Sequence, residues 1–216
     1  GFEITVKEDS DEIMGTATMD LKFKESTGGF VLDLVKKEEK KGMVVEVVEE
    51  VLNGKASQLN HQHVGEELRI QLKSPARVGD QKRFVIRYRG VPADGLIISK
   101  NRHGNRTLFG DNWPNRAHHW LPCVDHPSDK ATVTWTVHHP PGYKVVANGA
   151  LKEQTSNPDG GGTFVYEEDQ LLPTKVMVFG MADFAIDEVG MIGEIPISSW
   201  VFPEDTLKGF EHYDDA

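Results

Sequence analysis

Residues 132–138 read Thr-Val-Thr-Trp-Thr-Val-His, so polar and apolar side chains alternate at every position. Successive side chains of a β-strand point to opposite faces of its sheet, and this stretch therefore predicts a strand with one buried and one solvated face. The same alternation recurs at 16–24, 68–73 and 83–89. Half-buried strands are typical of antiparallel sheets that are covered on one side, so we predict a mainly β fold.

Further strands are expected where apolar runs lie between turn residues. The run 43–52 also fits one face of a helix, but its dense β-branched residues and the bounding Gly42 and Gly54 favour a strand. Many short strands with regular turns indicate stacked antiparallel sheets, arranged as a sandwich or a saddle. The other expected strands are 29–35, 95–99, 143–151, 163–168, 175–186 and 194–201.

The C-terminal residues follow a different pattern. Pro203, Glu204 and Asp205 suit the first turn of a short helix. A helix that begins there and stops at Ala216 is too short to be stable alone. We therefore expect one β domain over 1–201, followed at 202–216 by a linker or the first helix of a missing domain.

Composition excludes several classes of protein. Of the 216 residues, 27% are charged and 38% are hydrophobic, as in ordinary globular domains. The 24 basic and 34 acidic residues give a net charge of −10, which argues against nucleic acid or a membrane as the main partner. The single cysteine excludes an internal disulfide and a cysteine-rich zinc module. Neither an exported nor a cytoplasmic location is excluded.

The segment directly before the predicted strand at 132–138 has an unusual composition. Residues 109–130 read FGDNWPNRAHHWLPCVDHPSDK and contain three prolines, which a strand does not accommodate. We expect a structured loop here, and long structured loops often carry function. Trp113 and Trp120 are expected to anchor it by packing.

Three histidines in this loop, His118, His119 and His126, raise the possibility of a metal site. Adjacent histidines point apart on an extended chain, and no His-x-His pair with a nearby carboxylate completes a ligand set. We expect these side chains to hydrogen-bond backbone groups and expect no metal or other cofactor in this chain. Cys123 is expected to be a buried thiol, because no base marks it as a nucleophile.

Three motifs occur in and after the loop: Arg116 with Pro122-Cys123-Val124-Asp125-His126-Pro127, then Lys130-Ala131-Thr132, then Val145-Val146-Ala147-Asn148-Gly149. In order and spacing they resemble the N-terminal domain of the M1 zinc aminopeptidases. The resemblance is specific over 109–150 and looser over nearly all of the rest. It implies a saddle-shaped, mostly antiparallel β domain.

The resemblance also implies what lies outside this chain. In the family, a thermolysin-like catalytic domain carries Gly-x-Met-Glu-Asn for the substrate amine and His-Glu-x-x-His for zinc, and neither motif occurs here. Zinc, which acts as a Lewis acid when water attacks the first peptide bond, is therefore expected in the full-length parent. The parent would remove N-terminal residues from peptides, and this chain alone is expected to be inactive. Its expected partners are its own catalytic domain and the N-terminus of a peptide substrate.

One substrate-binding residue of the family comes from the N-terminal domain. It is a Glu or Gln about five positions before the arginine, and that position is Asp111 here. A carboxylate there would hold the free α-ammonium group of the substrate. Asp is one methylene shorter than Glu, and the alternative is a turn residue that bonds its own backbone. Phe109 and Asn112 are further substrate-binding candidates.

Other residues of the loop are expected to be structural. A buried pair of Arg116 with the Asp125 carboxylate would hold the shape of the loop and position Asp111 from behind. The expected structural residues are Arg116, Trp113, Trp120 and Asp125.

A rival hypothesis is a stand-alone, non-catalytic β-sandwich that binds a protein or glycan. Exposed aromatic side chains of the Trp113–Trp120 loop would form its binding surface. This hypothesis predicts a chain that ends in a closed strand, whereas the aminopeptidase hypothesis predicts a helix that continues into a second domain.

Overall fold

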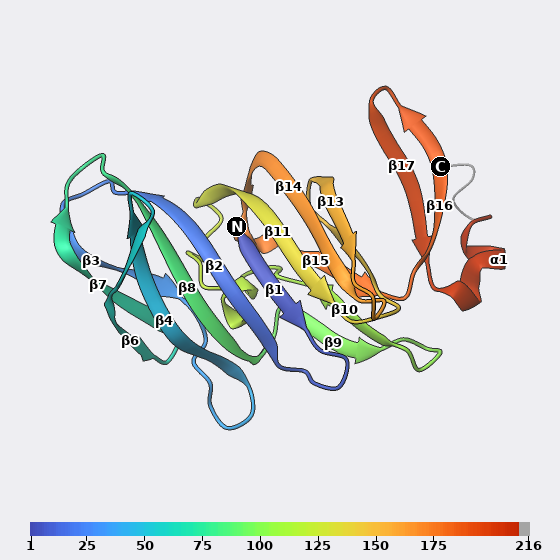
Figure 1. The fold of residues 1–216 in the computed structure, drawn as a ribbon, viewed down its shortest axis with the longest axis horizontal. Helices are drawn as coiled ribbons and strands as arrows, with labels where there is room; N and C mark the ends of the chain where they lie inside the picture. Colours follow the sequence, from blue (N-terminus) through green and yellow to red (C-terminus); the bar gives the residue numbers. More distant parts are fainter. Residues whose placement is uncertain (212–216) are drawn as a thin grey trace.

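The computed structural model describes residues 1–211 and has the mainly β architecture that the alternation predicts (Figure 1). Strands make up 61% of the chain and helical segments 6%. The strands form several antiparallel sheets, and the only α-helix among the described residues is one short turn near the C-terminus. The predicted fold class is therefore confirmed.

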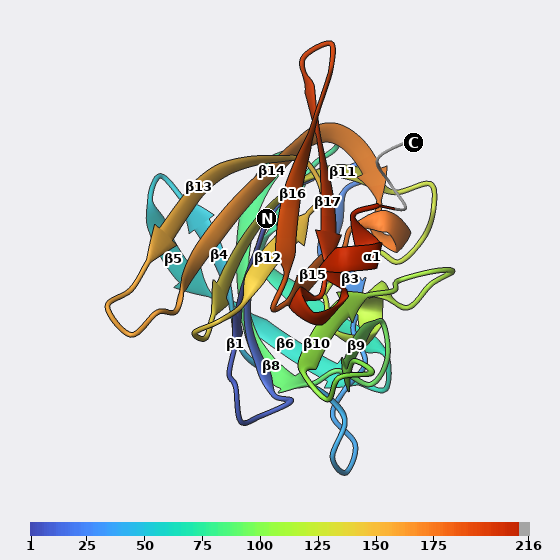
Figure 2. The same ribbon diagram turned by 90° about the vertical axis from the view of Figure 1, so that its right-hand side faces the viewer.

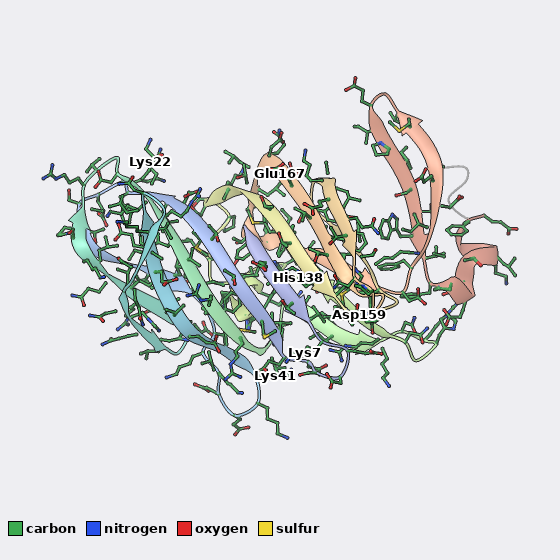
Figure 3. The ribbon with its side chains drawn as sticks, in the orientation of Figure 1. Lys7, Lys22, Lys41, His138, Asp159 and Glu167 are labelled. Carbon is green, nitrogen blue, oxygen red and sulfur yellow. The ribbon has the colours of Figure 1, made fainter. Side chains whose placement is uncertain are left out.

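The largest sheet has eight strands and runs through the whole domain. Its neighbouring strands are antiparallel, except that β1 and β11 pair in parallel and so join its two halves. His138 of β11 and Glu167 of β14 lie on this sheet (Figure 3). The order is β13 (Ala150–Ser156), β14 (Gly162–Pro173), β11 (Lys130–His139), β1 (Phe2–Val6), β2 (Ile13–Lys22), β8 (Gln81–Val91), β4 (Gly42–Leu52) and β5 (Lys55–Gln58).

Three smaller sheets complete the structure. One is β3 (Thr27–Asp33), β7 (Glu67–Ala76) and β6 (Asn60–Val64), and another is β12 (Lys144–Ala147), β15 (Phe179–Ala182), β10 (Arg106–Gly110) and β9 (Leu96–Lys100). The third is the hairpin of β16 (Ala185–Ile192) and β17 (Ile195–Val201), which lies apart from the other sheets in Figure 1 and whose tip extends beyond them in Figure 2. The helical segments are η1 (Ala117–His119), η2 (Thr174–Val176), η3 (Pro203–Asp205) and α1 (Thr206–Gly209).

The core lies between the large sheet and the smaller ones. Trp135, the central apolar residue of the alternating stretch, is fully buried and stacks on Trp120 of the loop, with ring centroids 5.8 Å apart. Phe179 of β15 packs edge-on against both indoles at 5.7 Å. The loop is therefore anchored to the large sheet by aromatic packing, which fixes the position of the residues before Trp120.

Several expected strands are confirmed, and others have different bounds. The ambiguous run 43–52 is strand β4. The single strand expected at 143–151 is instead two strands in different sheets, and the run 175–186 begins with a 3₁₀ turn before β15 and β16. Strands β5, β6 and β10 were not predicted, because they are short and have little alternation.

The helical start at Pro203 is observed as η3 and α1. Whether residues 202–216 begin a further domain stays a prediction, and 212–216 lie outside the described residues. None of the described helices has the length and apolar character needed to cross a membrane.

Candidate functional site

The candidate site begins where β10 runs into the loop. The N–H of Asp111 donates to the carbonyl of Gly95 at 2.6 Å, which extends the pairing of β10 with β9 by one step. Side chains therefore keep alternating: Leu108 and Asn112 point into the protein, whereas Phe109 and Asp111 point outward. The Asp111 side chain is 52% exposed. The fold thus presents an aromatic ring and a carboxylate side by side on one outer face.

Arg116 holds the Asp111 carboxylate. Its Nη2 lies 2.6 Å from Oδ2 of Asp111, and its Nε donates to the carbonyl of Trp113 at 2.6 Å. The pair expected between Arg116 and Asp125 is absent, and that expectation is wrong. The turn over 113–116 directs Arg116 back toward Asp111, at the outer surface, so the arginine–carboxylate pair involves the site residue itself and is partly exposed.

Asn112 lies inside the protein, with 1% of its surface exposed. Its Nδ2 donates to the carbonyls of Thr174 at 3.1 Å and Met177 at 2.7 Å, and its Oδ1 accepts the indole N–H of Trp120 at 2.8 Å. Both N–H donors and the oxygen of this amide are therefore hydrogen-bonded within the protein. Asn112 therefore connects the loop to η2 and to the core.

Asp125 is paired with a histidine of the same loop. Its Oδ2 lies 2.7 Å from Nδ1 of His118 and its Oδ1 accepts the Thr174 hydroxyl at 2.9 Å. The Asp125 carboxylate raises the pKa of His118 above its usual value, against the effect of burial. Burial raises the pKa of Asp125, but its hydrogen bonds with His118 and Thr174 outweigh this effect and lower it. Both shifts favour the charged forms, and this buried pair links two parts of the loop.

Among the other residues considered for metal binding or nucleophilic attack, only His118 and His119 are arranged differently from expectation. His118 and His119 do not point apart, because η1 brings their ring centroids to 4.6 Å. Nδ1 of His126 accepts the backbone N–H of Ser128 at 3.2 Å, as expected, and also lies 2.7 Å from the Ser128 hydroxyl. Within residues 1–211, no group of three His, Cys, Asp or Glu side chains could hold a metal ion. Cys123 is buried, and burial raises the pKa of its thiol.

The two tryptophans of the loop have different environments. Trp120 is fully buried, whereas Trp113 is 61% exposed and lies 4.6 Å from the ammonium of Lys175, which sits over its ring. The rival hypothesis needs both rings at the surface, so only Trp113 remains available for it.

The outer face of the four-stranded sheet is apolar beside Asp111. Phe109 pairs in register with Ile97 on β9 and with Gly180 on β15, which in turn pairs with Val146 on β12. A Cβ on Gly180 would lie 3.1 Å from the Phe109 ring and 3.4 Å from Val146, so the three residues share one face. This row is exposed. Phe109 and Val146 also line a groove of about 880 Å³, together with Phe184 and Trp200.

Residues 2–176 match the family model of the Peptidase M1 N-terminal domain. The chain belongs to this family. It is also 27% identical over 165 residues to the leucyl aminopeptidase of Saccharolobus solfataricus, a match that covers 70% of this chain and 18% of that protein.

Solved structures of M1 peptidases have the same fold. The M1 zinc metallopeptidase from Deinococcus radiodurans superposes with a TM-score of 0.74 at 24% identity, covering 92% of this chain and 45% of that one. A mutant of it bound to a Tyr-Ser-Ala substrate gives a TM-score of 0.73 with the same identity and coverage. The M1 N-terminal domain described here thus spans less than half the length of these relatives.

One residue of the M1 N-terminal domain at this site was missed from the sequence. Asp94 lies in the turn before β9, and its Oδ1 is 3.5 Å from Nη1 of Arg116. The pair Asp94-Gly95 is a turn signal, but only the pairing of β9 with β10 places this turn against the loop.

Proposed function

We propose that this chain is the substrate-positioning and docking domain of a zinc-dependent M1 aminopeptidase. Asp111 accepts the α-ammonium group of the peptide, and Phe109 contacts the side chain of the first residue. The domain docks on a catalytic domain of the same protein and has no peptidase activity alone. Asn112, first considered a substrate ligand, instead holds Asp111 in place from within the protein.

The position of Asp111 carries this proposal. Its carboxylate is half-exposed, its backbone is fixed by the hydrogen bond to Gly95, and its side chain is oriented by Arg116. A carboxylate held in this way can accept charge-assisted hydrogen bonds from an ammonium group without first being ordered.

The apolar row beside Asp111 supports the docking role. Ile97, Phe109 and Val146 are exposed on one sheet face, and contiguous exposed apolar surface is typical of an interaction site. The hairpin β16–β17 and α1 lead away from the same end of the molecule (Figure 1). We assign this face to the catalytic domain, because a domain docked there would enclose Asp111 at the interface.

Zinc is assigned to that second domain. The names of the structural relatives include zinc, but residues 1–211 do not offer a set of side chains that fits the ion. This domain therefore contributes binding and orientation, while its partner supplies the metal.

The experiment starts from the native reading frame beyond the codon for Ala216. We expect it to encode Gly-x-Met-Glu-Asn and His-Glu-x-x-His. In the full-length protein, Asp111→Ala should raise KM for leucine 4-nitroanilide by about ten- to a hundredfold, the size of a lost charge-assisted hydrogen bond. Asp111→Glu should keep most of the affinity.

Two controls make this test specific. The exposed Asp9 is remote in sequence from the site, and Asp9→Asn should change nothing although it also removes one negative charge. The isolated domain should hydrolyse no substrate. A stop codon directly after Ala216, or an unchanged KM for Asp111→Ala, would contradict the proposal and favour a stand-alone interaction domain that binds through Trp113.

A further inference from the structure

The charges next to Asp111 include one cation that competes with the substrate. Arg116 lies 2.6 Å from the Asp111 carboxylate, so an arriving ammonium group meets an anion whose charge is already compensated. Two opposite unit charges at this separation contribute no net charge to the site. A further negative charge close by would therefore strengthen the attraction of this domain for a cationic substrate.

Asp94 provides that charge on the other side of the guanidinium. Its Oδ1 lies 3.5 Å from Nη1 of Arg116, whereas Asp111 is bound to Nη2. Two carboxylates thus share one guanidinium, and the three groups carry a net charge of −1. The contact of Asp94 is the longer one, so it has room to shorten.

The backbone fixes Asp94 in this position. The N–H of Gly95 donates to Oδ1 of Asp94 at 2.8 Å, and the carbonyl of Gly95 accepts the N–H of Asp111 at 2.6 Å. Gly95 has a φ of +76°, and a Cβ there would lie 2.2 Å from the carbonyl oxygen of Arg116. The turn that carries Asp94 is therefore packed directly on the backbone of the loop that carries Arg116 and Asp111.

We propose that Asp94 is a positioning residue of the ammonium site and acts through Arg116. When the α-ammonium group binds, the Arg116 guanidinium exchanges its hydrogen bond to Asp111 for a closer one to Asp94. The Asp111 carboxylate then accepts hydrogen bonds from the ammonium N–H groups. Only hydrogen bonds are exchanged, and no proton moves. The inference rests on the proposed function of Asp111 and adds a second carboxylate to it.

The test uses Asp94→Asn in the full-length protein. Asparagine keeps the size of the side chain and the acceptor for the Gly95 N–H, but it removes the charge. KM for leucine 4-nitroanilide should rise by about five- to tenfold, as expected when one charge near the ligand is lost at a half-exposed site. The value of kcat should change by less than about twofold, because only binding of the ammonium group is weakened.

Three further variants separate positioning from a structural effect. Asp94→Glu should restore most of the affinity, and Asp9→Asn should leave KM unchanged. Adding Asp94→Asn to Asp111→Ala should raise KM little further, because both changes affect the same ammonium contact.

Opposite results would overturn the inference. If Asp111→Ala raises KM and Asp94→Asn does not, Asp94 has no such role, while the proposed function of Asp111 stands. A loss confined to kcat, or full additivity of the two substitutions, would also overturn it. If Asp111→Ala itself leaves KM unchanged, the ammonium site is absent and both proposals fall.

Discussion

His118 and Asp125 form a buried pair whose strength depends on pH. The His118 side chain is 11% exposed and that of Asp125 is 4% exposed. The charged groups around His118 are Asp125, Glu66 at 3.7 Å and Asp33, together with the neighbouring His119. The loop, β3 and the β6–β7 turn thus meet at one imidazole, and its protonation affects how firmly they are joined.

The pH dependence follows from the two pKa shifts. His118 has a raised pKa, so its contribution to stability is complete below its unfolded value of 6.5 and is lost as the pH rises through the folded pKa. Asp125 has a lowered pKa, so its contribution is present above 3.8 and is lost as the pH falls through the folded pKa. Asp125→Asn should therefore cost about 3 kcal/mol of unfolding free energy at about pH 5.5, and less at about pH 8.5.

Urea denaturation of the isolated domain at both pH values measures this difference. Some cost should persist at high pH, because Asp125 also accepts hydrogen bonds from Thr174 and the His118 N–H. The exposed His126 offers the control, and His126→Asn should change stability little at either pH. Equal costs of Asp125→Asn at both values would contradict the role of His118.

Single residues show which positions and contacts could be predicted from the sequence and which could not. Alternation placed Trp135 in the core, as observed, whereas Asp111 was predicted from the family resemblance and stays a prediction. Local sequence did not reveal that Arg116 binds Asp111 rather than Asp125, because the direction of a side chain in an irregular loop depends on its tertiary contacts. Asp94 was missed for the same reason, since a contact across 22 positions of the chain leaves no local pattern.

At the scale of elements, the run 143–151 shows why strand bounds are hard to predict. Apolar residues continue through Asn148-Gly149, yet β12 and β13 belong to different sheets. Gly149 has a φ of +87°, which lets the chain leave one sheet and enter the other. The side chain of Asn148 fixes this turn by accepting the N–H of Val178 at 2.7 Å.

Gly149→Ala should therefore destabilise the domain strongly. A Cβ at this position would lie 2.1 Å from the carbonyl oxygen of Glu167, in addition to the strain of the positive φ. We expect a loss of about 2–4 kcal/mol in unfolding free energy.

Gly142 is the matched control, because its φ of +82° is similar but nothing lies within 4 Å of a Cβ there. Gly142→Ala should cost only about 1 kcal/mol, the strain alone. Equal losses for the two variants would show that the close approach to Glu167 is not what makes Gly149 necessary.

At the scale of the whole molecule, the two large faces have different chemistry. On the solvated side of the eight-stranded sheet, arginines of β8 pair with acidic residues of β2 and β4, such as Arg83 with Asp20 and Arg87 with Glu49. The charged side chains of this face are paired within the sheet and lie in solvent, so the face does not require a partner domain to cover it. The outer face of the four-stranded sheet instead carries the apolar row of Ile97, Phe109 and Val146. This asymmetry favours one docking face, next to Asp111.

The single native cysteine allows a direct test of that face. Cys123 is buried and burial raises its pKa, so the unmodified protein should react slowly with a maleimide. Val146→Cys places a thiol within the apolar row, and Leu52→Cys places one in the exposed β4–β5 turn. In the isolated domain both engineered thiols should be labelled rapidly. In the full-length protein, labelling at position 146 should slow by at least about tenfold because the catalytic domain covers it, while position 52 should react as before. If position 146 is labelled equally fast in both proteins, the docking surface lies elsewhere. Asp111 would then remain open to solvent, and the proposed site closed between two domains would be contradicted.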